Sequence, residues 1–164
     1  HGAAAFVVYN LTHPTTEESV QTPIAAHDYA YAGSFIQPEA EPWEVPDEGL
    51  VYYDWYKGNG GLLNKSYNIE LDGFSDRLVQ ISPVVKGWSV IGRSDKYLSA
   101  AAVQSIDYSE KELKVKLVES GPLVVYHNGD ISCKSASQIK DMGDGLWEII
   151  FPAGVSDFEV SIKG

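Results

Sequence analysis

The sequence predicts an all-β domain, an antiparallel β-sandwich of roughly ten short strands with a long Pro-rich loop region near the N-terminus. Two observations support this prediction: short runs in which apolar and polar residues alternate, and turn residues between those runs. In the run from 112 to 119, Leu113, Val115 and Leu117 alternate with two lysines and Val118. A period of two residues is typical of a strand with one buried face.

Further strands and turns follow the same pattern along the chain. Strand-like runs recur at 77–84, 101–108, 146–151 and 158–162. Asn128-Gly129 lies between two apolar stretches and predicts a hairpin, because this dipeptide adopts the tight turn that joins two strands. The Asp-Gly pairs at 72–73 and 144–145 predict further turns, and the polar residues 108–112 predict a strand-to-strand tip. No segment predicts a helix longer than two turns, and the best candidate is 95–102.

The stretch from Thr12 to Glu48 interrupts this rhythm, and we expect a long loop region there. It carries Pro14, Pro23, Pro38, Pro42 and Pro46, and the acidic residues Glu39, Glu41, Glu44, Asp47 and Glu48. In its middle, residues 25–34 could form a short strand or cover one end of the sandwich. Long loops of compact domains are commonly functional or face a partner, although an acidic run is more often a solvated surface.

Composition limits the function classes. The chain has 164 residues and a net charge of −11, which fits one domain, 1–164, and disfavours nucleic acids and anionic membrane surfaces as partners. No apolar run reaches the roughly 18 residues of a membrane span. The single Cys133 excludes an internal disulfide. Because no nucleophile-elbow, phosphate-loop or zinc-protease motif occurs, we predict no catalytic residue, no metal and no cofactor.

The aromatic stretch 51–56, VYYDWY, is the most distinctive local feature. If it forms a strand, Tyr53 and Trp55 point to one face and Asp54 to the other, because side chains alternate along a strand. A lone ionised carboxylate is expected in solvent. Tyr53 and Trp55 would then enter the core.

This orientation predicts a carbohydrate-binding surface. Tyr52 and Tyr56 would flank Asp54 on the outside, with Trp43 contributing from the loop region. Aromatic rings stack on the apolar face of a sugar, while a carboxylate accepts hydrogen bonds from its hydroxyl groups. The alternative is a cross-strand aromatic ladder that stabilises the sheet and binds nothing; the sequence alone favours this structural interpretation.

Residues 78–103, LVQISPVVKGWSVIGRSDKYLSAAAV, resemble part of the C-terminal β-sandwich of family 36-type glycoside hydrolases, the α-galactosidases and the raffinose-synthase-like, seed-imbibition-type proteins. The likeness rests on the Pro-Val step at 83–84 and on GWSVIGRSDKY at 87–97, with its Ile-Gly step. Three further pieces follow the expected order: AAAFVVYNLT at 3–12, GLVYYDWYKG at 49–58 and GPLVVYHNGD at 121–130. The Pro-rich stretch before Gly49 has no assigned counterpart.

The resemblance implies a non-catalytic C-terminal accessory domain of a larger α-galactosidase-like hydrolase. Its partner would be the catalytic (β/α)₈ barrel of the same parent chain. The 164 residues of this chain are too few to form such a barrel and lack its alternation of strands and helices. No catalytic residue is therefore carried over from the family. The chain starts without Met and reaches a strand-like run at once, and we expect a segment of a longer protein. The resemblance also implies an extracellular or periplasmic location.

Two other functions stay open. One is a carbohydrate-binding β-sandwich module that holds an oligo- or polysaccharide through Trp43, Tyr52, Asp54 and Tyr56. The other is a free-standing β-sandwich enzyme that uses two acids of the loop region, such as Asp28 and Glu44, as the carboxylate pair of glycoside hydrolysis.

Overall fold

The computed structural model describes residues 2–12, 19–36 and 41–164 and confirms an all-β fold, with 55% of the described residues in strands and 8% in helices. In these residues thirteen strands form four antiparallel sheets. The strands are β1 (Ala4–Asn10), β2 (Val20–Ala25), β3 (Leu50–Asp54), β4 (Asn59–Leu62), β5 (Ser66–Leu71), β6 (Ser75–Pro83), β7 (Trp88–Arg93), β8 (Val103–Tyr108), β9 (Glu112–Glu119), β10 (Leu123–His127), β11 (Gln138–Gly143), β12 (Leu146–Ile150) and β13 (Ser156–Lys163). The helices are α1 (Ala26–Ile36) and the 3₁₀ helix η1 (Ser99–Ala102).

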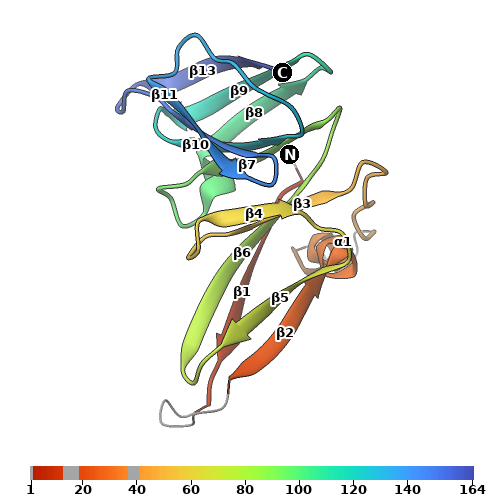
Figure 1. Cartoon of the computed structure of the whole chain (residues 1–164). Helices are drawn as coiled ribbons and strands as arrows, with labels where there is room; N and C mark the ends of the chain where they lie inside the picture. Colours follow the sequence, from red (N-terminus) through yellow and green to blue (C-terminus); the bar gives the residue numbers. More distant parts are fainter. Residues whose placement is uncertain (1, 13–18, 37–40) are drawn as a thin grey trace.

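The sheets stack in four layers. The outermost layer on one side is the β2–β5 ribbon with α1, and next to it lies the β6 sheet, in the order β1-β6-β3-β4. The β10 sheet follows, in the order β11-β12-β10-β7, and the β9 sheet, β13-β9-β8, covers its other face. Figure 1 shows β3 and β4 crossing between the β9–β10 sandwich and the long strands β1, β6, β5 and β2.

A separate hydrophobic core fills each of the three spaces between layers. The first core, between the ribbon and the β6 sheet, contains Ile24, Leu50, Ile69, Val79 and Ile81. The second core, between the two inner sheets, contains Val51, Tyr53, Ile91, Val124, Tyr126 and Leu146. The third core contains Trp88, Leu113, Val115, Leu117, Leu123, Val125, Ile149 and Ile162. The central strands of the two inner sheets are therefore covered on both faces, whereas the edge strands β1 and β11 keep exposed side chains.

Pattern-based predictions succeed where a strand has one wet face. Leu113, Val115 and Leu117 are fully buried on β9, as the alternation predicts. The polar tip joins the paired strands β8 and β9, and Asp144-Gly145 joins the paired strands β11 and β12, so both turns are confirmed.

The hairpin predicted at Asn128-Gly129 is wrong. Asn128-Gly129 follows β10, but β10 pairs with β7 and β12, and the residues after it form only an isolated bridge between Ser132 and Lys163. The turn predicted at Asp72-Gly73 is present and leads from β5, in the outer ribbon, to β6, in the adjacent sheet. In both places the chain changes layers.

The prediction of a long loop region from Thr12 to Glu48 is wrong where the structure describes it, because β2 and α1 form within this stretch. Helix α1 is absent from the sequence prediction, which expected a short strand or a cover at 25–34. Its alanines and Gly33 dilute the apolar periodicity that identifies a helix. The carboxylate of Asp28 accepts a hydrogen bond from the backbone N–H of Ala25 at 2.8 Å, and Tyr29 is buried in the first core. In the candidate helix 95–102, η1 alone is helical. Within the described ranges no helix is long and apolar enough to cross a membrane.

The Pro-rich region is tied to the sheets where the structure describes it. Both carboxylate oxygens of Glu48 accept backbone N–H groups, from Lys86 at 2.7 Å and from Gly87 at 2.6 Å, in the turn between β6 and β7. Glu48, at the end of the acidic run, thus stabilises the turn between β6 and β7. Pro14, Pro38 and Glu39 lie outside the described residues.

Gly92 allows β7 to pass close to η1. Its φ is +113°, and a Cβ atom added there would overlap the carbonyl oxygen of Ser99. The same glycine pairs with Val124 next to a register shift in β10, which is typical of a β-bulge. Only a residue without a side chain fits this backbone.

We expect Gly92→Ala to lower the free energy of unfolding by about 2–4 kcal/mol, because it combines backbone strain with a clash against main-chain atoms. Gly58→Ala is the matched control, since Gly58 also has a positive φ, +62°, but no atom lies within 4 Å of an added Cβ. Its cost should be about 1 kcal/mol. Urea unfolding followed by circular dichroism measures both, and equal losses would contradict the close approach.

Candidate functional site

Asp54 is fully buried, so the expectation that it faces solvent is wrong. The phenol of Tyr67, on β5, donates a hydrogen bond to its Oδ2 at 2.8 Å, and the backbone N–H of Lys57 donates to its Oδ1 at 3.1 Å. The Nε of Arg77, on β6, lies 3.9 Å from Oδ2. A carboxylate can be buried when hydrogen bonds and a nearby cation replace its contacts with water. Here β5 supplies the hydrogen bond from Tyr67, and β6 supplies the cation of Arg77.

Tyr52 belongs to the same buried network. Its ring stacks on that of Tyr67, with centroids 4.3 Å apart and planes at 21°, so one of its faces is covered. The ammonium group of Lys57 donates to the phenol oxygen of Tyr67 at 3.2 Å. Burial and, after it, the hydrogen bond to Asp54 raise the pKa of Tyr67. This Asp54 network, made of Tyr52, Asp54, Lys57, Tyr67 and Arg77, fastens β5 to the β6 sheet.

Trp43 lies in a different setting. Its ring packs at 57° on Tyr29 of α1, with centroids 5.3 Å apart, and its backbone N–H donates to the carbonyl of Ala30 at 2.9 Å. Of the four residues predicted to hold a sugar, Trp43 thus anchors the Pro-rich segment to α1, while Tyr52 and Asp54 share the buried network. Tyr56 remains at the surface.

Trp55 and Tyr56 directly follow β3, and Tyr56 is exposed whereas Trp55 is half-buried. The phenol of Tyr56 donates to Asp76 Oδ2 at 2.6 Å, and this hydrogen bond is the main cause of its raised pKa. The guanidinium of Arg77 lies over the same ring, 5.6 Å from its centroid. Trp55 was predicted to enter the core and is half-buried against the second core. Its indole N–H donates to the carbonyl of Lys96 at 3.0 Å.

A hollow of about 530 Å³ lies next to Trp55 and is lined in part by its neighbour Tyr97. Trp55 contacts Tyr97 edge-on, with centroids 5.4 Å apart. Tyr97, Leu98 and Val118 line the hollow and are 42%, 55% and 50% exposed. We call Trp55, Tyr56, Tyr97, Leu98 and Val118 the aromatic face. An exposed apolar group of this kind is a candidate interaction surface.

Arg93 forms one wall of the hollow and is itself almost fully buried. Its Nε and Nη2 donate to the two carboxylate oxygens of Asp95 at 2.9 and 2.6 Å, and its Nη1 donates to Glu119 Oε2 at 3.3 Å. The hydrogen bond from Arg93 lowers the pKa of Asp95. A glycosidase acid needs a raised pKa, so Asp95 is chemically unsuited to that role, and the pair instead makes the wall rigid.

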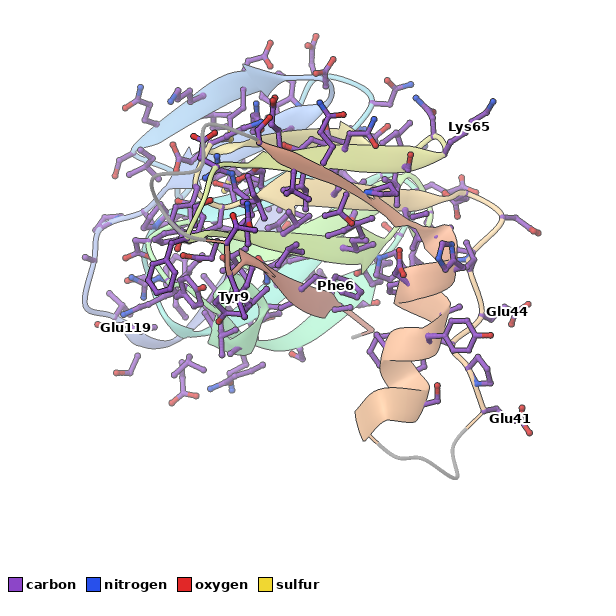
Figure 2. The ribbon with its side chains drawn as sticks, turned by 90° about the horizontal axis from the view of Figure 1, so that it is seen from below. Phe6, Tyr9, Glu41, Glu44, Lys65 and Glu119 are labelled. Carbon is purple, nitrogen blue, oxygen red and sulfur yellow. The ribbon has the colours of Figure 1, made fainter. Side chains whose placement is uncertain are left out.

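The aromatic face continues toward the edge strand β1. Tyr9 is exposed and lies directly opposite Asp76 in the β1–β6 register, so its side chain points to the same side as that carboxylate. Figure 2 shows Tyr9 and Glu119 on one side of the molecule, whereas Glu41 and Glu44 of the acidic run lie beside α1 on the other. Tyr9 and Glu119, which lines the hollow, therefore lie on a different side of the molecule from Glu41 and Glu44.

No protein-family model and no curated protein matches this chain. Among residues 2–12, 19–36 and 41–164, no group of three or more His, Cys, Asp or Glu side chains could hold a metal ion. Sequence reasoning identified Tyr56 but missed Tyr97, Leu98 and Val118. The available signal was Val118 on the polar side of an otherwise regular alternation.

We expect Asp54→Ala to lower the free energy of unfolding by about 3 kcal/mol, because it leaves the Tyr67 phenol and the Lys57 amide without their acceptor in a buried site. Asp54→Asn, which keeps one acceptor, should lose less. The exposed Asp107 on β8 is the matched control, and Asp107→Ala should change stability by less than about 0.5 kcal/mol. Urea unfolding tests this, and a small loss for Asp54→Ala would contradict the network.

The Arg93–Asp95 pair should make stability depend on pH. Because the pKa of Asp95 is lower in the folded state, the pair stabilises the fold above the unfolded pKa of about 4 and loses this contribution as the pH falls through the folded value. We expect Asp95→Asn to cost about 1 kcal/mol at pH 7. The difference from the wild type should shrink below about pH 4.

Urea unfolding between pH 2.5 and 7 measures this difference (about the range over which carboxylates titrate). Asp107→Asn serves as the control, since its side chain is exposed on β8. A loss for Asp95→Asn that stays constant over the whole range would show that the ionised carboxylate is not the source of the stabilisation.

Proposed function

We propose that this chain is a non-catalytic accessory β-domain of a larger α-galactosidase-like glycoside hydrolase and that its aromatic face packs on the catalytic (β/α)₈ barrel of the same parent protein. The observation that carries the proposal is the aromatic face with its adjoining hollow. Its function would be structural: to cover part of the barrel and stabilise it.

The geometry of the rings favours a protein partner over a sugar at this face. Trp55 lies at 89° to Tyr56 and at 68° to Tyr97, so the three rings do not make one flat platform. The polar atoms of Trp55 and Tyr56 already have partners in Lys96 and Asp76. Apolar surface with few free hydrogen-bonding groups suits the centre of a protein interface, where aromatic residues are enriched.

The resemblance and the surface coincide. Residues 78–103, which carry the likeness to the family 36-type domain, include Arg93, Tyr97 and Leu98 of the hollow and all of η1. The aromatic face is also held in place before any partner binds, because Arg93 and Trp55 are fixed by hydrogen bonds. Preorganised side chains lose little conformational entropy on docking.

An interface between domains of one chain typically covers about 600–1,500 Å². The hollow of about 530 Å³ would admit a protruding side chain or turn of the barrel. The charged groups of Lys96 and Glu119 line the same hollow and would form its polar rim.

The coding region upstream of the His1 codon is expected to encode the barrel. Expressed as a separate polypeptide, that barrel should bind this chain in sedimentation-velocity and calorimetry experiments. The double variant Leu98→Asp/Val118→Asp should weaken binding at least tenfold, because it places two charges in the interface. Both residues are half-exposed, so the fold should tolerate the change.

Val20→Asp is the matched control, since Val20 is similarly exposed but lies on β2 in the outer ribbon. It should leave binding unchanged. An upstream region without a barrel, or binding that is insensitive to the double variant, would overturn the proposal.

A further inference from the structure

A second hollow lies where the edges of the two inner sheets meet. Strand β4 is the edge of the β6 sheet and contacts β11 and β12 of the β10 sheet (Figure 1). The hollow between them measures about 420 Å³ and includes Tyr52, Asn64, Tyr126, Asn128 and Asp144 in its lining. We call it the edge groove. It shares no lining residue with the aromatic face.

Glycines shape this groove. Gly61 pairs with Tyr52 in the β3–β4 register, and a Cβ added to Gly61 would lie 3.0 Å from the Cβ of Asp144. A Cβ added to Gly145 would lie 2.6 Å from the ring of Tyr126. Both side chains reach the groove because the facing residue has none.

The backbone of the β11–β12 turn presents Asp144 to the groove. Asp144 has a φ of +50° and stands between Gly143 and Gly145, whose φ angles are also positive. Its negative charge contributes, after burial, to the raised pKa of Tyr52. Tyr52 and Asp144 line the same groove, although they come from different sheets.

The chemistry of the groove matches a neutral sugar. The carboxamides of Asn64 and Asn128 can each donate and accept hydrogen bonds, and the carboxylate of Asp144 accepts them, which corresponds to hydroxyl groups that do both. The half-buried ring of Tyr52 offers apolar surface beside these polar groups. Of the described residues that line the groove, none is Lys or Arg, so an anionic ligand would meet the Asp144 charge uncompensated.

A second hollow adjoins the edge groove and extends the surface that a ligand could contact. A neighbouring hollow of about 380 Å³ shares Asn128, Asp144 and Gly145 with it and adds His127 and Trp147. Ligand sites commonly have volumes of about 300–1,000 Å³. The two hollows together thus provide adjacent positions, each with an aromatic side chain and shared polar groups.

We propose that the edge groove is a binding site for a neutral oligosaccharide, which lies against Tyr52 and hydrogen-bonds to Asn64, Asn128 and Asp144. Tyr52 is the single residue of the four predicted from the sequence that lines this groove. The site is separate from the proposed docking face, so either proposal can fail while the other stands.

The test is a ¹H–¹⁵N NMR titration of the whole chain with raffinose, maltotriose and xylotriose, and with glucuronic acid as the anionic comparison. At least one neutral sugar should shift the amides of 61–64, 126–129 and 143–146 in a saturable manner, and glucuronic acid should not. Asn64→Ala and Asn128→Ala should each weaken this binding about tenfold, the equivalent of 1.4 kcal/mol.

Asn59→Ala is the matched control, because Asn59 is exposed on the same strand as Gly61 but does not line the groove. It should leave the affinity unchanged, and the amide spectrum of each variant reports that it is folded. No saturable shift with any neutral sugar, or shifts confined to Tyr56, Tyr97 and their neighbours, would overturn the proposal. Equal losses for Asn59→Ala and Asn64→Ala would overturn it as well.

Discussion

The rest of the molecule depends on the burial of the central strands of the two inner sheets on both of their faces. In β10, Val124 and Tyr126 point into the second core, while Leu123 and Val125 point into the third. Every strand of this kind packs against two neighbouring layers at once, so its side chains must fit closely against the residues of both layers. Some polar side chains are buried there too, and Gln80 Oε1, Ser82 Oγ and Ser89 Oγ have no hydrogen-bond partner among the described residues. With these strands covered on both faces, the sheet edges, the loops and the outer faces are left for binding.

The same constraint explains how much of the fold the sequence could predict. Strand β9 has one wet face, and its alternation identifies both the strand and its buried residues. Strands β7 and β10 are apolar on both faces, so their sequence predicts a strand but not its neighbours. Asp54 shows the limit most clearly, because its burial depends on Tyr67 and Arg77, which no local pattern connects to it. Helix α1 was missed because its small residues carry little periodic signal.

The candidate sites are assembled from distant segments. Tyr56 could be identified because it stands in an unusual aromatic run, but Tyr97 and Val118 come from later parts of the chain and meet Trp55 and the hollow only through the stacking of the sheets. In the edge groove, Asn64, Asn128 and Asp144 each occupy a turn or loop and look ordinary in sequence. The sequence predicts a turn at Asp144, which stands between two glycines. It does not predict the contact of Asp144 with β4, which forms because the edges of two sheets meet.

The long-range pairing of β1 has a consequence for synthesis of the protein. Ala4 pairs with Ile81 and Asn10 with Ser75, so β1 leaves the ribosome well before its partner β6 exists. The hairpins β8–β9 and β11–β12, in contrast, can close as soon as they emerge. During that interval the nascent chain carries an apolar strand with two open edges, the kind of segment that pairs wrongly with other chains. Strand β1 therefore stays unpaired for longer during synthesis than the strands of these two hairpins.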